Sequence, residues 1–452
     1  GVQTCALPIS ITISNAGTRL ISSSLMRMSM GTSSVATMTV NGGMVNGSQL
    51  QMGHGSTSVS TFTVTGGSVG FNGTSAATSG NMVGYAAGSS GTLAFTGGTT
   101  SFAGAVTVGG VGTALGGGLS QGLVKVEGGV ITTSTAVSGL DNHFILGRYL
   151  ATTGEMVMTG GTFTAQRDFY VGGSGTGTLT LSGGRMQVGR LFISSTVALQ
   201  MNNTGGVGSV TVSSGTLLVT GSGSAANLVV GTNATGTGSL TINGSGVVIV
   251  GGTLSRGAVG AINLQPGGTL QIGTGTGSGG ILLSNTGSLV NDGTLVFSRG
   301  ADSSVSGVIS GSGSVIKRVG VTWLTYTGSN TYSGLTSVEG GRLRLSGSGS
   351  LGTGGLSLAA GTTFDLGPLT AGTYTLPATG NLLGSGTVLG SGKTLAVLGS
   401  FLPGSSATGT MSLDSGLTLD LSAAAGSTFQ LTDPAFAAGT YDLVSGRSEE
   451  HT

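Results

Sequence analysis

The sequence predicts an all-β protein folded as a right-handed parallel β-helix, a β-solenoid of short strands with glycine corners. Three observations indicate this fold: short runs of apolar residues that alternate with Thr and Ser, glycine pairs that recur along the chain, and a scarcity of charge. Alternation with period two is typical of strands with one buried face. Glycine supplies the backbone angles of tight corners. Because no run has the period of an amphipathic helix, we expect strands and corners throughout.

A strand–turn unit recurs in the first part of the chain. It reads TMTVNGG, TFTVTGG, TLAFTGG, VKVEGG, MVMTGG and LTLSGG, with the first glycine of each pair at Gly42, Gly66, Gly97, Gly128, Gly160 and Gly183. The successive spacings of 24, 31, 31, 32 and 23 residues form two classes, as expected of one coil with or without an extra loop. We therefore predict equivalent inward positions for Val40, Val64, Phe95, Met158 and Leu181.

Charged residues are few: 15 Lys and Arg and 14 Asp and Glu among 452 residues, of which 93 are glycine. Disorder is excluded because 37% of the residues are hydrophobic and the net charge is only +1. Coils of a solenoid stack about 4.8 Å apart, where identical charges repel by about 1 kcal/mol even in water. Ladders of Ser, Thr and Asn avoid that repulsion. Without a basic cluster, we expect no nucleic-acid partner.

The two ends differ from the rest of the chain. The C-terminal RSEEHT and the N-terminal CALPI can be encoded by opposite strands of one DNA sequence, which resembles a sequencing-library adapter. We therefore expect residues 1–10 and 447–452 to be adapter-derived and the natural signal peptide to be missing by truncation. We also expect residues 1 to about 9 and 447–452 to pack against nothing periodic. Cys5 is the only cysteine, so the natural part is expected to have no disulfide, thiol catalyst or cysteine-ligated zinc.

The sequence pattern of the repeats changes near residue 291. We therefore divide the expected solenoid into residues 11–290, with repeats of 23–32 residues, and residues 291–446. The segment from Asn291 to Gly352 resembles the autotransporter-associated β-strand repeat. The motif residues that carry this resemblance most closely are Asn330, Thr331, Tyr332, Gly334, Thr336, Val338, Gly341 and Leu343. The resemblance implies a secreted passenger region of a Gram-negative autotransporter or a large extracellular protein of the PEP-CTERM type. The repeat unit of that family has no catalytic residues.

The motif can also be interpreted from its residue types. Asn330 is expected to bond its own backbone in a turn, and Gly334 and Gly341 to form corners. Strands are expected at 336–338 and 343–345, with Tyr332 packing on a neighbouring coil. Alternatively, Trp323 and Tyr332 are sugar-stacking platforms, although aromatic residues are also usual in solenoid cores.

A polysaccharide lyase or glycosidase is the enzymatic alternative. A glycosidase needs two carboxylates about 5 to 10 Å apart, which a solenoid provides only at equivalent positions on neighbouring coils. Relative to their glycine turns, Glu127 and Glu155 are out of register by four residues. Asp141 and Asp168 are 27 residues apart, which matches neither spacing class. We expect no catalytic residues.

Other site motifs are incomplete. Asp414 and Asp420 are expected to share one strand face, but six residues along a strand span about 20 Å. The run GGSGTGTLT imitates a calcium-binding repeat, with Gly177 where the liganding Asp belongs. His54 and His143 have no second histidine at metal-ligand spacing, and we expect both to be ordinary loop or surface residues. The sequence therefore predicts no metal site and no cofactor.

These observations favour a non-enzymatic stalk, matrix or adhesin element that is extracellular or displayed on a bacterial cell surface, that of the Gram-negative outer membrane. The expected partners are glycans, matrix or cell surfaces, bound through weak multivalent contacts. A membrane would be reached only through an anchor or barrel outside this segment. A β-helical polysaccharide-processing enzyme and a phage-type fibre are the alternatives.

Overall fold

The structure of the protein is a computed structural model. The structure describes residues 8–73, 80–110, 119–133, 143–194, 206–221, 228–231, 236–275, 289–404 and 411–422. The chain divides into two compact units. Unit 1 comprises 1–274 with 279–287, and unit 2 comprises 275–278 with 288–452.

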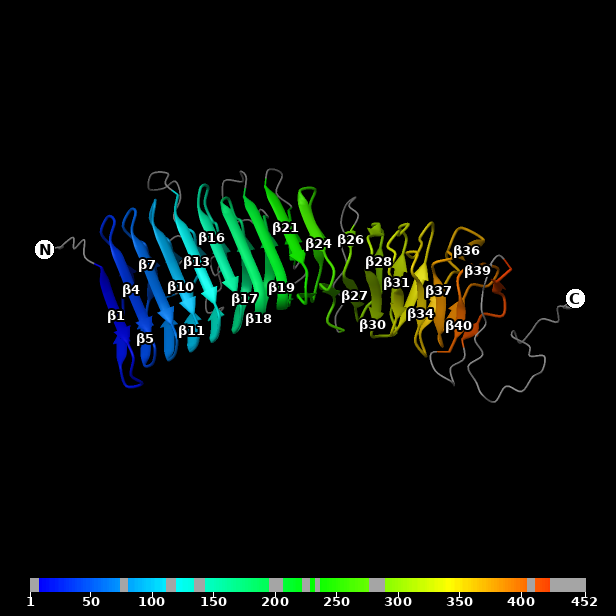
Figure 1. Cartoon of the computed structure of the whole chain (residues 1–452), viewed down its shortest axis with the longest axis horizontal. Coiled ribbons are helices and arrows are strands. Elements are labelled where there is room, and N and C mark those ends of the chain that lie inside the picture. Colours follow the sequence, from blue (N-terminus) through cyan, green and yellow to red (C-terminus); the bar gives the residue numbers. More distant parts are fainter. Residues whose placement is uncertain are drawn as a thin grey trace, which may run out of the picture. The chain divides into compact units, whose positions relative to one another are not determined.

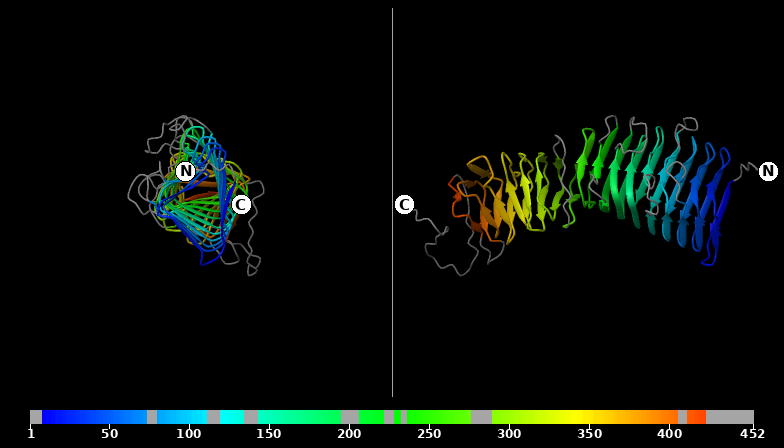
Figure 2. Two further views of the ribbon diagram at one scale, coloured as in Figure 1. Left: turned by 90° about the vertical axis from the view of Figure 1, so that its left-hand side faces the viewer. Right: turned by 180° about the vertical axis from the view of Figure 1, so that it is seen from behind.

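Unit 1 is a stack of coils in which each full coil contributes strand segments to three parallel ladders. Figure 1 shows these strands side by side from blue to green, and the left view of Figure 2 shows that they lie on different sides of the coil and enclose its core. The described residues of this unit form no helix, and the strands that neighbour each other in a ladder are parallel. The predicted all-β parallel β-solenoid is therefore confirmed.

The first ladder contains β1 (Ile9–Ile13), β4 (Val35–Val40), β7 (Val59–Val64), β10 (Ser90–Phe95), β13 (Gln121–Val126), β16 (Thr153–Met158), β18 (Thr176–Ile193), β19 (Val207–Val219), β21 (Thr237–Ile242) and β24 (Gly260–Leu264). The second contains β2 (Arg19–Ile21), β5 (Met44–Gly47), β8 (Ser68–Phe71), β11 (Thr99–Phe102), β14 (Val130–Thr133), β17 (Thr162–Val171), parts of β18 and β19, β22 (Val247–Val250) and β25 (Thr269–Ile272). The third contains β3 (Leu25–Met28), β6 (Gln49–Met52), β9 (Asn81–Val83), β12 (Val106–Val108), β15 (Phe144–Leu146), the ends of β17 and β18, β20 (Leu228–Val230) and β23 (Leu254–Arg256).

The first ladder has the register that the repeats predict. Val40 pairs with Val64 and Val64 with Phe95, and beyond Val126 the same column continues through Met158 to Leu181. All of these side chains are buried. Buried and part-exposed residues alternate along β4, β7 and β10, because successive strand residues point to opposite faces. The prediction of equivalent inward positions is confirmed.

Glycine forms the corners for a steric reason. Gly161, which follows β16, has a φ of 68°, in the left-handed region that disfavours residues with a Cβ. A Cβ on Gly161 would lie 2.7 Å from the carbonyl carbon of Gly128 in the preceding coil. The corner therefore needs glycine both for its backbone angle and for the close approach of stacked coils.

The first coil begins earlier than the expected boundary at residue 11. Ile9 and Ser10 belong to β1, where they pair with Ala36 and Thr37 of β4. Residue 9 thus already belongs to the periodic structure, although it was expected to be the last residue of a segment that packs against nothing periodic. Residues 1–7 and 447–452 lie outside the described residues.

Unit 2 is also a parallel solenoid of short strands. One ladder contains β27 (Thr294–Ser298), β30 (Ser314–Arg318), β32 (Thr336–Val338), β34 (Gly355–Leu358), β37 (Asn381–Gly384) and β40 (Phe401–Pro403), with β26 (Leu289–Asn291) beside β29 (Ile309–Ser310). A second contains β28 (Ser303–Val305), β31 (Trp323–Tyr326), β33 (Arg342–Leu345), β35 (Thr363–Asp365), β38 (Thr387–Leu389) and β41 (Ser412–Leu413). A third contains β36 (Thr373–Leu376), β39 (Thr394–Val397) and β42 (Thr418–Asp420).

The core of unit 2 is built from inward columns such as Leu324, Leu343 and Phe364, which pair in register and are buried. No helix in the described part of the chain is long and apolar enough to cross a membrane.

Candidate functional site

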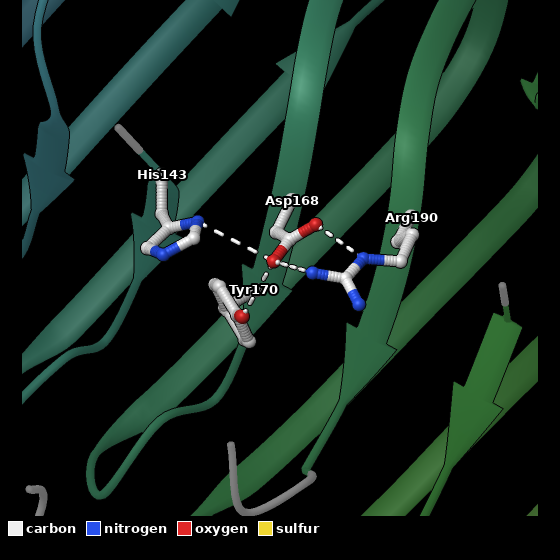
Figure 3. Close-up of polar contacts among 4 residues, drawn as sticks. All are labelled: His143, Asp168, Tyr170 and Arg190. Atoms are coloured by element: carbon white, nitrogen blue, oxygen red, sulfur yellow. Dashed lines mark hydrogen bonds and ion pairs between the residues drawn. The ribbon is translucent and has the colours of Figure 1, made fainter. Parts of the chain in front are cut away.

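A cluster of four polar side chains in unit 1 is the strongest candidate for a site. Asp168 and Tyr170 lie on β17, Arg190 lies on β18, and His143 directly precedes β15. Asp168 pairs in register with Arg190, and Phe144 pairs with Phe169. The third ladder therefore brings four side chains from three successive coils together, as Figure 3 shows.

The carboxylate of Asp168 is the centre of this cluster. The Arg190 guanidinium donates to both of its oxygens, from Nε to Oδ1 and from Nη2 to Oδ2, at 2.6 Å each. The Tyr170 hydroxyl donates to Oδ2 at 3.0 Å, and His143 Nδ1 lies 3.5 Å from the same oxygen. Asp168 is only 4% exposed, so these partners replace the water that a buried charge would lose.

The environment fixes the protonation of two of these groups. Burial, and then the negative charge of Asp168, raise the pKa of Tyr170 far above its ordinary value, so the phenol stays neutral and donates. The hydrogen bond to Asp168 raises the pKa of Arg190. Asp168 and Arg190 thus form a bidentate, charge-assisted pair across two coils.

Aromatic rings surround the charged pair. The Tyr170 ring stacks on Phe192 with centroids 4.9 Å apart, and the edge of His143 meets the Tyr170 ring at 5.1 Å. On the other face of the strand, Phe169 stacks on Phe144 at 4.9 Å and faces the core. Tyr170 and Phe192 therefore point out of the solenoid, yet they are buried together with Ile145 and Val229. This part of the third ladder is covered on both faces.

Both oxygens of the Asp168 carboxylate accept hydrogen bonds from within the cluster. A carboxylate that orients a catalytic histidine resembles part of a Ser-His-Asp triad, but both oxygens of Asp168 are bound by Arg190, and one also by Tyr170. The arginine balances the carboxylate charge without a ligand. Chemically, the arrangement joins three coils and pairs a buried carboxylate with a partly exposed guanidinium.

The structure corrects the expectation for His143. We expected an ordinary loop or surface residue, but the side chain is buried and borders Asp168. His54 also has an aromatic partner, since it stacks on Tyr85 with centroids 4.8 Å apart. Burial, and then the charge of Arg27, lower the pKa of His54. Asp141 lies outside the described residues.

The placement of the other acids bears on the enzymatic alternative. Glu155 pairs with Leu123, four residues before Glu127, so the expected mismatch of these two acids is confirmed. The expectation that Asp414 and Asp420 share a strand face is wrong, because a turn closed by the bond from the Leu417 N–H to the Asp414 carbonyl separates β41 from β42. Among the described residues, no three His, Cys, Asp or Glu side chains form a group that could hold a metal ion.

Asn330 acts over a longer range than its sequence context predicts. We expected a bond to its own turn, but its Oδ1 accepts the Ile309 N–H at 2.8 Å and its Nδ2 donates to the Ser350 carbonyl at 2.7 Å. Ile309 lies on the preceding coil and Ser350 on the following one. Asn330 is 5% exposed, so one buried amide bridges three coils.

The rest of the 330–343 motif forms the turn and strands around Asn330. The expected strands at 336–338 and 343–345 correspond to β32 and to part of β33. The Thr331 N–H donates to the Ile309 carbonyl, and Gly341 has a φ of 78°. A Cβ on Gly334 would collide with the Gly313 carbonyl. Thr336, Val338 and Leu343 are buried.

Tyr332 is excluded as a sugar platform because it is fully buried. Its hydroxyl lies 2.7 Å from Thr336 Oγ1. A Cβ on Gly352 would lie 2.5 Å from the Tyr332 ring, so the ring packs on the next coil, as expected.

Comparisons with known proteins add no family. No family model matches the chain, and neither a curated protein nor a solved structure matches it. The fold, the side-chain geometry and the sequence motif of residues 291–352 are therefore the basis for the proposal that follows.

Proposed function

We propose that the chain is a non-enzymatic stalk, matrix or adhesive element that is secreted or displayed on a bacterial cell surface. The observation that carries this proposal is the outward face of the first ladder. Thr37, Thr61 and Thr92 follow one another in register on it. Further along, Thr178, Ser209 and Ser239 do the same, with 3.3 Å between the hydroxyl oxygens of the last two.

Such a face offers hydroxyl groups on runs of successive coils, although Leu123 and Glu155 occupy this column between Thr92 and Thr178. Each position binds weakly, but a ligand that spans several coils gains from the number of contacts. The resemblance of residues 291–352 to the autotransporter-associated repeat supports the extracellular setting, with glycans, matrix or cell surfaces as partners. In this proposal a membrane is reached only through an anchor or barrel that is not part of this segment.

Nested coil deletions test this proposal. Removing 59–89, 59–120 or 59–152 joins strand positions that are equivalent in the first ladder, because Val59, Ser90, Gln121 and Thr153 lie in one register column. We expect attachment to cells or to immobilised glycans to weaken step by step over the three deletions. The single substitution Glu155→Gln, on the same ladder, is the control and should leave attachment unchanged.

The enzymatic alternative predicts different results. If the full chain cleaves any member of a polysaccharide panel, and one carboxylate substitution removes the turnover, the scaffold proposal fails. Threefold assembly in solution would instead favour a phage-type fibre.

A further inference from the structure

The outward face of β31 and β33 in unit 2 differs from the hydroxyl-rich faces. It bears Trp323, the only tryptophan of the chain, in register with Arg342 of the next coil. Two residues further along, Thr325 pairs with Arg344, and Arg344 pairs with Asp365 of β35. We call Trp323, Arg342, Arg344 and Asp365 the Trp323 face.

The indole ring holds both arginines. The guanidinium carbon of Arg344 lies 3.9 Å from the centroid of the Trp323 ring, and that of Arg342 lies 5.3 Å from it. Both distances are within the range of a cation–π interaction. The Trp323 N–H of the main chain donates to Asp302 at 2.9 Å, which fixes the start of β31. The ring therefore orients two cationic groups that would otherwise repel each other.

The charge on this face is only partly balanced. Arg344 Nε donates to Asp365 Oδ2 at 2.9 Å, and Oδ1 of the same carboxylate accepts the Gly367 N–H. Within the described part of the chain, ion pairs join Asp168 to His143 and Arg190, Arg318 to Glu339, and Arg344 to Asp365. Arg342 takes part in none of them and is exposed. Its guanidinium faces solvent with the indole as its neighbour.

These features define what the face can bind. A guanidinium presents a planar fork of N–H donors that matches a carboxylate in two parallel bonds. A partly exposed indole beside it offers an apolar surface to a sugar ring. Few other charged side chains of the protein compete with this guanidinium for an anionic ligand, since only 6% of the residues are Asp, Glu, Lys or Arg.

We propose that the Trp323 face binds acidic polysaccharide, with Arg342 pairing with a uronate carboxylate and Trp323 contacting the sugar ring. This deepens the proposed function and rests on it, because it names a ligand class at one discrete place on the adhesive solenoid. Arg344 stays paired with Asp365, and its guanidinium packs on the indole and holds the ring in place. A ligand that lies along the second ladder of unit 2 reaches both groups at once.

The test uses the full chain and oligogalacturonate. Because Trp323 is the only tryptophan, its fluorescence reports binding at this face. We expect a saturable change for the unaltered protein, a dissociation constant about tenfold higher for Arg342→Gln, and a smaller loss for Arg342→Lys. The matched control is Arg318→Gln, which removes the same charge from an arginine paired with Glu339 and should bind as before.

Three outcomes would overturn the proposal: equal binding by Arg342→Gln and the unaltered protein, equal binding of a carboxyl-reduced neutral oligomer, or tighter binding of single-stranded DNA at the same ionic strength. Thermal unfolding followed by Trp323 fluorescence shows whether each variant is folded. The deletion of 59–152 lies within unit 1 and leaves β31, β33 and β35 in place. The deletion can therefore weaken attachment without loss of oligogalacturonate binding, and Arg342→Gln can weaken oligogalacturonate binding without loss of attachment. The two proposals are thus tested separately.

Discussion

Asp168 and Arg190 occupy equivalent positions on adjacent coils and are joined by two contacts of 2.6 Å. The carboxylate is 4% exposed and the arginine side chain 28% exposed. In Asp168→Asn the amide keeps the shape but loses the charge and one acceptor. The arginine then loses its counter-charge.

We expect Asp168→Asn to lower the local opening free energy of β17 and β18 by about 2 kcal/mol, as is typical for hydrogen bonds to charged groups. Hydrogen exchange of the peptides that cover these strands measures it. Glu155→Gln, on the outward side of β16, is the control and should change protection by less than about 0.5 kcal/mol. Equal protection in both variants would show that the pair is not stabilising.

The corner glycines make a second prediction. In Gly161→Ala, the left-handed φ of 68° costs about 1 to 2 kcal/mol, and the new Cβ also collides with the backbone of Gly128. We expect a total loss near 3 kcal/mol, because crowding in a packed site adds to the backbone cost. Hydrogen exchange of the adjoining strands measures the loss.

Gly361 separates the two causes of that loss. Its φ is 76°, but a Cβ there would have no atom within 4 Å. Gly361→Ala should therefore cost only the backbone strain, about 1 to 2 kcal/mol. If both substitutions cost the same, the close stacking of coils would contribute nothing.

The sequence predicted the inward column because it repeats. Val40 and Val64 occupy the same place before a glycine pair, and the spacing of those pairs is the spacing of the coils. Core position, strand period and corner position all depend on nearby residues. Such local rules suffice for the first ladder and for the strands at 336–338 and 343–345.

The same rules did not predict the contact between Asp168 and Arg190. β17 has one more residue than β18 between paired positions, since Ala165 pairs with Val188 but Asp168 pairs with Arg190. This bulge shifts the register of the third ladder, and a fixed repeat cannot reveal it. Asn330 was misjudged for a related reason: a turn rule describes bonds within a few residues, whereas its partners are 20 and 21 residues away.

Asn330 makes a third prediction. Asn330→Asp keeps an acceptor for the Ile309 N–H, but it removes the donor to Ser350 and places a charge in a buried position. We expect a loss of about 3 kcal/mol, seen by hydrogen exchange in β29 and β32, because an unpaired buried polar group carries its full desolvation cost. The same change at the exposed Asn263 should have little effect, and a comparable loss at both sites would refute the bridging role.

Buried tyrosines in unit 2 make the fourth prediction, which concerns alkaline pH. Burial raises the pKa of Tyr326 and of Tyr332 above the ordinary value of 10.0, and both side chains are fully buried. Folded and unfolded chains are both protonated at these phenols below pH 10, so they add no pH dependence there. Above pH 10 the unfolded chain ionises first and is stabilised, so the unfolding free energy of unit 2 falls as pH rises.

Each of these tyrosines contributes a slope of up to about 1.4 kcal/mol per pH unit above pH 10. Urea unfolding followed by Trp323 fluorescence measures it, because the only tryptophan of the chain lies in this unit. Tyr326→Phe removes one ionisable group while it keeps the ring in the core. Its stability should therefore fall less steeply above pH 10 than that of the unaltered protein. Parallel curves for the two proteins would show that Tyr326 ionises as easily in the folded chain as in the unfolded one, which a buried phenol should not do.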